Sequence, residues 1–218
     1  MKVFYLWNFK PGETQTVPRT IIQNNQKYTD SYTIITKYDF DIFLKKENLF
    51  QEFPKLQNVI SQIPKWIILT DLARLLLIYC YSGLYCDVDC ILQKPLLFAK
   101  NPNKVYTFEE KVVPSTTWLG PREKKQNKYR RRIANYCFGT DVVRHAFFKK
   151  LIEECISRFE ILLQEGGNPA QWTLHDIFWC CGPDVITTLY HDEKDQTIFH
   201  LYDQSYVKHL QYGSWKKY

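Results

Sequence analysis

Two carboxylates stand one residue apart in Asp87-Val88-Asp89, directly after an apolar stretch. Unpaired carboxylates are costly to bury, so these two must be solvated, paired with a cation or bound to a metal ion. Hard divalent ions such as Mn²⁺ and Mg²⁺ take carboxylate oxygens and keep coordination positions open for phosphate groups. Surface turns also produce this short motif, so it indicates metal-assisted chemistry at a phosphate only together with its surroundings.

A second charged pair precedes this motif inside an apolar segment. Asp71 and Arg74 are three residues apart, which makes them neighbours on one face of a helix. The apolar residues around them repeat at helical spacing and predict a helix buried on nearly all sides; they are Leu69, Leu72, Ala73, Leu76, Leu77 and Cys80. One interpretation is a salt bridge within the helix. The other is that both side chains reach a ligand at the cleft edge that carries the two aspartates.

The elements that must position these residues alternate along the chain. Apolar and β-branched runs predict strands at 3–7, 31–36, 84–92, 105–109 and 133–139, the fourth and fifth less regular than the first two. Helices are predicted at 16–28, 39–47 and 145–164, besides the buried helix after Pro64, and Asp39 is a candidate N-cap. Short links between strands and helices favour one layered α/β domain over residues 1–218.

Composition narrows the function classes. Residues 122–132 hold seven basic side chains and one acidic one, which equals the whole net charge of +6. The rest of the chain is therefore near neutral, which argues against a nucleic-acid partner. Seven cysteines without a paired spacing indicate reduced thiols, and no apolar run reaches the roughly 18 residues of a membrane span. We expect a cytoplasmic protein, or the soluble catalytic domain of a longer or anchored one.

The two motifs together resemble a known signature. Thr70-Asp71-Leu72-Ala73-Arg74, the turn at Gly83, and Tyr85-Cys86-Asp87-Val88-Asp89 are similar to the signature of glycosyltransferases of the DXD sugar-binding-region type. These form family 32, which includes yeast mannosyltransferases, and they are related to the glucosylating domains of clostridial toxins. The close match covers about residues 66–92, and the chain length is similar to that of small viral members. The N-terminal segment common in the yeast-type branch is absent, so the acceptor preferences of that branch are not carried over.

The resemblance implies a fold and a reaction. The fold would be the GT-A glycosyltransferase fold, a Rossmann-like mixed sheet flanked by helices, with the nucleotide at the carboxyl ends of the strands. The reaction would move a hexosyl or related sugar from a nucleotide diphosphate, with UDP favoured and GDP as the alternative, to a glycan, glycoprotein or other sugar acceptor, with Mn²⁺ or Mg²⁺ as the cofactor. We expect a monomer or a weak oligomer.

The resemblance also implies roles for individual residues. Asp89 would bind the metal ion together with Asp87, which also touches the ribose or the donor sugar, and with His209. The residues implied in donor binding are Leu6, Trp7, Thr70, Asp71, Arg74, Tyr85, Asp87, Val88, Ser214 and Trp215. The residues implied near the reacting sugar are Asp71, Arg74, Asn135 and Asp176. Trp7 would lie against the nucleotide base, although an ordinary core tryptophan remains the alternative.

The C-terminal stretch from His209 to Trp215 resembles an element that closes over the diphosphate in related enzymes. Its aromatic character and Gly213 predict a lid that orders when metal and nucleotide bind. Cys181-Gly182-Pro183 resembles the Thr-Gly-Pro turn of the family, with cysteine in place of threonine.

Two other classes of function remain open. A metal-dependent phosphoryl-transfer enzyme or nuclease also uses paired aspartates at strand ends, but it usually needs a third acid downstream, and the sequence does not identify one. A non-catalytic α/β module could dock a polyanion on the basic segment 122–132. No carboxylate identifies itself as a general base, and the resemblance alone implies retention of configuration.

Overall fold

A six-stranded mixed sheet organises the computed structural model, which describes residues 1–12, 16–63, 65–96, 98, 103–112, 131–165 and 168–211. Its strands, in the spatial order β2-β1-β3-β6-β5-β7, are β2 (Ser31–Thr36), β1 (Lys2–Trp7), β3 (Gly83–Cys86), β6 (Arg131–Thr140), β5 (Val105–Val112) and β7 (Phe199–Tyr202). β1 runs parallel to both neighbours, β6 runs antiparallel to β3 and β5, and β7 is parallel to β5. A short ribbon of β4 (Cys90–Leu92) and β8 (Val207–His209) stands apart from this sheet.

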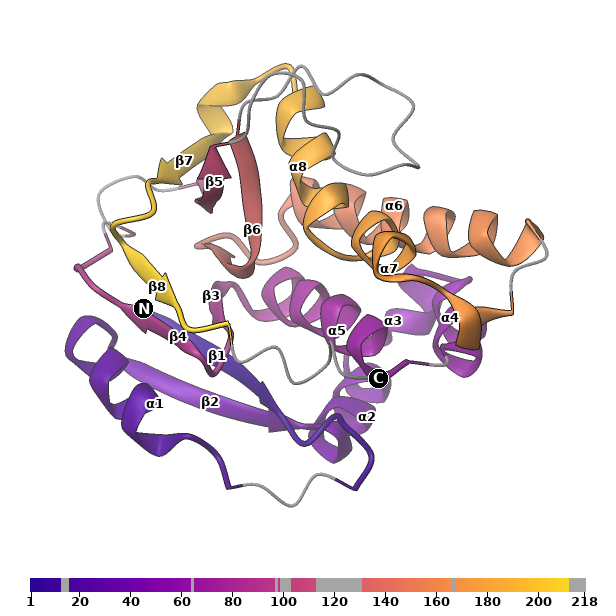
Figure 1. The fold of residues 1–218 in the computed structure, drawn as a ribbon, viewed down its shortest axis with the longest axis horizontal. Helices are drawn as coiled ribbons and strands as arrows, with labels where there is room; N and C mark the ends of the chain where they lie inside the picture. Colours follow the sequence, from indigo (N-terminus) through magenta and orange to yellow (C-terminus); the bar gives the residue numbers. More distant parts are fainter. Residues whose placement is uncertain are drawn as a thin grey trace.

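The two faces of the sheet bury different layers. Alternation along β1 sends Phe4 and Leu6 into one core and Val3 and Tyr5 into the other. The first core holds most helices, which are α2 (Lys37–Lys46), α3 (Leu49–Glu52), α4 (Leu56–Gln62), α5 (Trp66–Tyr81), α6 (Ala146–Gln164), α7 (Leu174–Cys180) and α8 (Pro183–Asp192). The second core lies under α1 (Arg19–Asn25) and the β4–β8 ribbon. Figure 1 shows α5 and α6 on one side of β3 and β6 and the ribbon on the other.

Helix α5 confirms the expected buried helix. Residues 68–80 are all buried, including both charged members of the Asp71–Arg74 pair. The helix ends at Ser82, whose φ is 55°, and Gly83 follows with a φ of 98°. A Cβ on Gly83 would lie 2.7 Å from the carbonyl oxygen of Lys2, so the turn into β3 requires glycine. The chain can therefore reverse sharply from the helix into the strand that leads to the paired aspartates.

Other expectations are confirmed or corrected at the level of single caps and strands. β2 covers the predicted strand, and α6 begins one residue after His145, which is its N-cap. The predicted N-cap Asp39 is wrong: Thr36 is the N-cap of α2, and Asp39 is the third helical residue of the same capping box. The strand predicted at 84–92 is two strands in different sheets, because the turn that carries the aspartates interrupts it.

The basic segment lies mostly outside the described residues. Its last two members, Arg131 and Arg132, begin β6 and form ion pairs with Glu109 at 3.0 Å and Glu110 at 3.1 Å. All seven cysteines are free and buried, as expected for reduced thiols. Among the described residues, no helix combines the length and apolar character that crossing a bilayer requires.

Candidate functional site

A cleft of about 350 Å³ opens beside the ends of β1 and β3. Its wall combines the end of β1, the N-terminal half of α5, the Asp87–Asp89 turn, part of β6 and residues of α7, α8 and β8. Of the residues predicted from the sequence, those that line it are Leu6, Trp7, Thr70, Asp71, Arg74, Tyr85, Asp87, Val88, Asp89, Asn135 and His209. The structure thus gathers residues that are up to about two hundred positions apart in the chain.

Arg74 lies at the floor of this cleft, where several oxygen atoms surround its guanidinium group. Its Nη2 lies 2.5 Å from Oδ1 of Asp71, and its Nη1 lies 3.5 Å from Oδ1 of Asp87. Nη1 also donates to the carbonyl oxygen of Asn135 at 2.5 Å. The Asp71–Arg74 pair is therefore a salt bridge within the helix, and both residues also line the cleft, while their contact with a ligand stays a prediction.

Tyr85 and Asn135 complete the group around Arg74. The guanidinium carbon of Arg74 lies 5.0 Å from the centre of the Tyr85 ring, a cation–π contact. Asn135 donates from Nδ2 to Oδ1 of Asp71 at 3.3 Å. Tyr85 donates its hydroxyl to Oδ1 of Asp87. Polar contacts around Arg74 therefore hold α5, β3 and β6 together where the charged side chains of the cleft meet.

The turn that carries the paired aspartates is held by its backbone. The amide of Asp87 donates to the carbonyl oxygen of Tyr136 at 2.8 Å, and the amide of Cys90 donates to the carbonyl oxygen of Asp87 at 3.0 Å. The first bond continues the β3–β6 pairing by one residue, and the second closes the turn. Both carboxylates are thus presented to the cleft by a loop with few conformational options.

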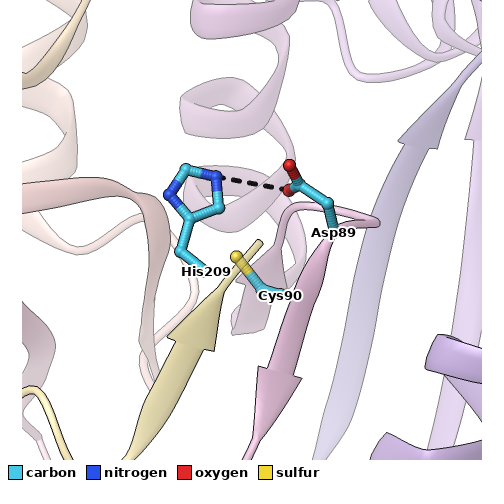
Figure 2. Close-up of side chains that lie close together, drawn as sticks. All are labelled: Asp89, Cys90 and His209. Carbon is cyan, nitrogen blue, oxygen red and sulfur yellow. Dashed lines mark ion pairs between the residues drawn. The ribbon is translucent and has the colours of Figure 1, made fainter. Parts of the chain in front are cut away.

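Asp89 and His209 form the candidate metal pair. Nε2 of His209 lies 3.3 Å from Oδ1 of Asp89, and the two side chains face each other in Figure 2. Strand β8 brings His209 there by pairing with β4, and the amide of Leu210 donates to the carbonyl oxygen of Asp89 at 2.9 Å. One carboxylate oxygen and one imidazole nitrogen at this separation suit Mn²⁺ and related divalent ions, so these residues fit the implied cofactor.

The site concentrates negative charge. Burial raises the pKa of Asp71 to about 7, and the charge of Arg74 opposes that rise. Burial also raises the pKa of Asp87, again against Arg74. For His209, burial lowers the pKa, but the hydrogen bond and charge of Asp89 outweigh burial and leave the pKa above its ordinary value. The rises for Asp71 and Asp87 have the sign expected of buried carboxylates, and a neighbouring carboxylate adds to each in the same direction.

Trp7 lines the cleft at the end of β1. Its side chain is half-buried and lines the cleft together with Leu6, Asn8, Phe9 and Lys10. Asn8 follows with a φ of 59°, a left-handed conformation that turns the chain out of the strand and along the cleft. An aromatic ring that is half-exposed beside a cleft can stack on a planar ligand, which a fully buried ring cannot.

Glu110 is a cleft residue that the sequence did not reveal. It lies on β5 with a side chain 25% exposed, and the guanidinium of Arg132 lies 3.1 Å away. Nη2 of Arg132 in turn lies 3.0 Å from Oδ1 of the fully buried Asp184. The pair Glu109-Glu110 at the end of a predicted strand was the available signal, but nothing in the sequence says which of the two faces the cleft.

Two aromatic residues were also missed. Tyr136 lines the cleft with its ring centre 4.1 Å from that of His209. Phe178 of α7 lines it beside Glu110, with the guanidinium carbon of Arg132 5.3 Å from the centre of its ring. From the sequence, both residues are expected to be ordinary core residues. Only the tertiary structure shows that part of each ring lies at the cleft.

Asp176 is not among the cleft residues. Thr173 is the N-cap of α7, and Asp176 is the third helical residue of its capping box: the backbone amide and the hydroxyl of Thr173 donate to Oδ2 of Asp176 at 2.7 and 2.8 Å. The structure therefore gives Asp176 a role in starting the helix. Residues 212–215 of the predicted lid, which include Ser214 and Trp215, lie outside the described residues.

Comparisons with known proteins bear on the motif region and on the fold. Residues 13–112 match the family model described as a glycosyltransferase sugar-binding region containing the DXD motif. The solved structure named PaToxG Glycosyltransferase superposes with a TM-score of 0.59 over 90% of this chain and 72% of that chain, at 16% sequence identity. No curated protein sequence matches the chain.

The two comparisons confirm the expected resemblance to DXD-type glycosyltransferases and the expected fold. The chain resembles DXD-type glycosyltransferases in its motif region, and its mixed sheet flanked by helices is the GT-A glycosyltransferase fold. Neither comparison tests the assignment to family 32 or a viral origin, and neither identifies a donor or an acceptor.

Proposed function

We propose that this protein, over a single catalytic domain of residues 1–218, is a metal-dependent glycosyltransferase. It takes a hexosyl or related sugar from a nucleotide diphosphate, UDP rather than GDP, and passes it to a hydroxyl group of a glycan, glycoprotein or other sugar. The family match over the motif region and the GT-A fold support sugar transfer in general. The cleft supports the finer assignment.

The balance of charge in the cleft is the observation that carries the proposal. Among the described residues that line the cleft, Asp71, Asp87, Asp89 and Glu110 are acidic and Arg74 and Lys10 are basic, and Glu110 is also paired with Arg132. The charge of a diphosphate would be repelled by such a wall unless a divalent cation entered with it. When bound to Asp89 and His209, that ion would stabilise the negative charge that develops on the departing nucleotide diphosphate. Mn²⁺ or Mg²⁺ is the proposed cofactor.

Different residues of the cleft have different proposed roles. Trp7 would stack on the base at the end of β1. Arg74 and Asp71, fixed against each other at 2.5 Å and against Asn135, would orient the hydroxyl groups of the donor sugar. Asp87 would contact the ribose or the sugar, since Tyr85 and Arg74 hold its carboxylate in place. Orientation of this kind lowers the barrier because the reacting groups are held before the reaction begins.

Glu110 and Phe178 would receive the acceptor. They line the cleft from β5 and α7, and Arg132 contacts both side chains, at 3.1 Å from the Glu110 carboxylate and 5.3 Å from the centre of the Phe178 ring. An ionised carboxylate can accept a hydrogen bond from an acceptor hydroxyl, and the ring of Phe178 can pack on a sugar face. The pairing of Glu110 with Arg132 also weakens the alternative of a phosphoryl-transfer enzyme, because an acid that is already paired is a poor additional metal ligand.

The cellular setting is also part of the proposal. Seven free, buried thiols fit the reducing conditions of the cytoplasm. The proposed partners are the nucleotide sugar and the acceptor, with no nucleic acid, and the proposed state is a monomer or a weak oligomer.

A hydrolysis panel tests the function directly. UDP- and GDP-linked sugars are incubated with the protein in Mn²⁺, in Mg²⁺ and in a chelator, and release of the nucleotide diphosphate is measured. We expect release from one or a few UDP-sugars that requires the divalent ion, and no release by Asp89→Asn, which keeps the shape of the side chain but removes its charge. Absence of release from every donor, combined with thermal stabilisation by polyanions without metal, would instead establish the binding module.

A further inference from the structure

Cys90 lies directly beneath the candidate metal pair. In the β4–β8 ribbon Cys90 is the cross-strand partner of His209, and its neighbour in sequence is Asp89. Ligand atoms of these three side chains, one carboxylate oxygen, one thiol sulfur and one imidazole nitrogen, all lie within 4.8 Å of one another. In Figure 2 the sulfur of Cys90 points toward the space between the other two side chains.

The spacing is close to that of a metal site. Zn²⁺ binds sulfur at about 2.3 Å and imidazole nitrogen or carboxylate oxygen at about 2.0–2.2 Å, so the ligand atoms of one tetrahedral ion stand roughly 3.6 Å apart. The separation of 3.3 Å between His209 and Asp89 already satisfies this. The other ligand atoms lie at most 4.8 Å apart, so a small rotation of one side chain would bring them to the spacing of a bound ion.

The position of Cys90 is fixed by the backbone around it. Nδ2 of the buried Asn25 donates to the carbonyl oxygen of Cys90 at 2.9 Å, and Oδ1 of Asn25 accepts from the amide of Leu92 at 2.8 Å. The amide of Cys90 closes the turn onto Asp87. The cysteine is fully buried and does not line the cleft, so an ion held by Asp89 and His209 would meet its sulfur from the cleft side.

The thiol of Cys90 has only weak sulfur contacts, one of them a side-chain hydrogen bond with Cys86. Its sulfur lies 3.9 Å from the carbonyl oxygen of Tyr136, a long contact for a weak donor. Cys86 and Cys137 are buried nearby, but they are not part of the group that could hold an ion. A sulfur ligand matters for the choice of metal, because thiolate favours Zn²⁺, Co²⁺ and similar ions, whereas Mg²⁺ takes oxygen ligands.

We infer that Cys90 is a third protein ligand of this metal site and makes the site selective for thiophilic divalent cations of the Zn²⁺ and Co²⁺ class over Mg²⁺. The inference rests on the proposed function only for the location of the site. On binding, the thiol of Cys90 loses its proton to solvent as the sulfur–metal bond forms, and neither the metal nor the sulfur changes oxidation state. Asp89 and His209 supply the other two protein ligands.

Cobalt spectroscopy of the full chain tests this inference without any substrate. Co²⁺ is titrated into the reduced wild-type protein and into Cys90→Ser, and a sulfur-to-cobalt charge-transfer band is sought in the near ultraviolet. We expect the band in the wild-type protein and its loss in Cys90→Ser. Cys137→Ser is the matched control, since it removes an equally buried thiol from β6 in the main sheet, and it should keep the band.

Calorimetry with the metals alone provides the second readout. Replacing Cys90 by serine should weaken Zn²⁺ binding by about tenfold or more and change Mg²⁺ binding much less. Asp89→Asn and His209→Ala should each weaken the cobalt band if the three residues share one ion. Cys90→Ala serves in place of the serine variant if circular dichroism shows that the latter does not fold.

The inference is overturned by any of three results: no cobalt band in the wild-type protein, a band that survives loss of Cys90, or a band that depends on Cys90 but not on Asp89 and His209. None of these results bears on hydrolysis of a nucleotide sugar in Mn²⁺, which tests the proposed function separately. Conversely, a cobalt band without any hydrolysis would leave a metal site in a protein of different function.

Discussion

At the scale of single residues, the cleft depends on one guanidinium group. Arg74 is about 4% exposed and meets Asp71, Asp87 and the backbone of Asn135 at once. Its planar fork matches this arrangement of oxygens, whereas a lysine would supply one compact charge that cannot reach all of them together. Under the proposed function, the orientation of the donor sugar would therefore depend on the shape of this side chain as well as on its charge.

We predict that Arg74→Lys lowers turnover of the nucleotide sugar by about a hundredfold, because oriented groups lose about that much when displaced by an ångström. Affinity for UDP with Mn²⁺ should change little, since Arg74 contacts the sugar and not the base. Steady-state kinetics and calorimetry measure the two quantities. If the Arg74→Lys variant melts many degrees lower but keeps its turnover, then the Asp71–Arg74 pair is only a structural salt bridge.

Trp7 provides the complementary prediction at the nucleotide end. We expect Trp7→Ala to weaken UDP binding by about 1–3 kcal/mol, the contribution of one base stacked on an aromatic ring. Trp7→Phe should retain most of the affinity, since a ring remains beside the base. Calorimetric titration with UDP and Mn²⁺ gives both values. Unchanged affinity with a lower melting temperature would mark Trp7 as an ordinary core tryptophan.

At the scale of elements, the start of one helix and a close contact at a glycine help to position the elements that form the cleft. The capping box of Thr173 and Asp176 begins α7, which carries Phe178 to the cleft. Between β3 and β6, Gly139 pairs with Leu84 and lets the two strands approach closely. Neither device touches the proposed substrates, so each should affect stability before it affects chemistry.

For the capping box, we predict that Thr173→Ala and Asp176→Ala each lower the free energy of unfolding by about 1 kcal/mol, a usual cost for a lost N-cap. Both variants should retain near wild-type transfer at 25 °C. Urea unfolding and activity assays on the two proteins decide the matter. If Asp176→Ala loses activity while Thr173→Ala keeps it, then Asp176 acts in the reaction and the helix cap is not its main role.

For the strand contact, we predict that Gly139→Ala destabilises the protein by about 3 kcal/mol or more, in the upper range for overpacking. A Cβ there would lie 2.3 Å from the carbonyl oxygen of Gly83 and 3.1 Å from Cα of Leu84. Gly12→Ala is the control: its φ is 71° but nothing lies within 4 Å, so only the backbone cost of about 1–2 kcal/mol remains. Similar unfolding curves for the two variants would contradict the prediction.

Elements with a strong local pattern were predictable from the sequence. Helix α5, strands β1 and β2 and helix α6 have regular apolar spacing over their whole lengths, and the paired motifs identified the donor side of the cleft. Glu110, Phe178 and the partner strand of β4 could not be predicted, because their positions follow from long-range pairing between strands. Asp39 was misplaced as an N-cap, and Asp176 occupies the equivalent position in the capping box of α7. A capping box contains both an N-cap threonine and an acidic third residue, and the acid draws attention first.

At the scale of the whole molecule, ligands should stabilise the fold because the cleft joins distant parts of the chain. We predict that Mn²⁺ and UDP together, at about a hundredfold excess over the dissociation constant, stabilise the protein by about 2.7 kcal/mol and raise its melting temperature by roughly 5–10 °C. UDP with a chelator should do much less, and His209→Ala should lose most of the joint effect. Thermal unfolding followed by fluorescence provides the measurement. An equal shift by UDP without metal would contradict the charge argument.

The β4–β8 ribbon has a mechanical consequence. Asp89 and His209 are 120 residues apart along the chain and meet across two short strands. An ion bound to both would close a ring that contains β5, β6 and helices α6 to α8. If the two chain termini were pulled apart, the residues inside this ring could not extend while the ion stayed bound. At about 3.5 Å per extended residue, the unfolded chain would then be shorter by roughly 420 Å.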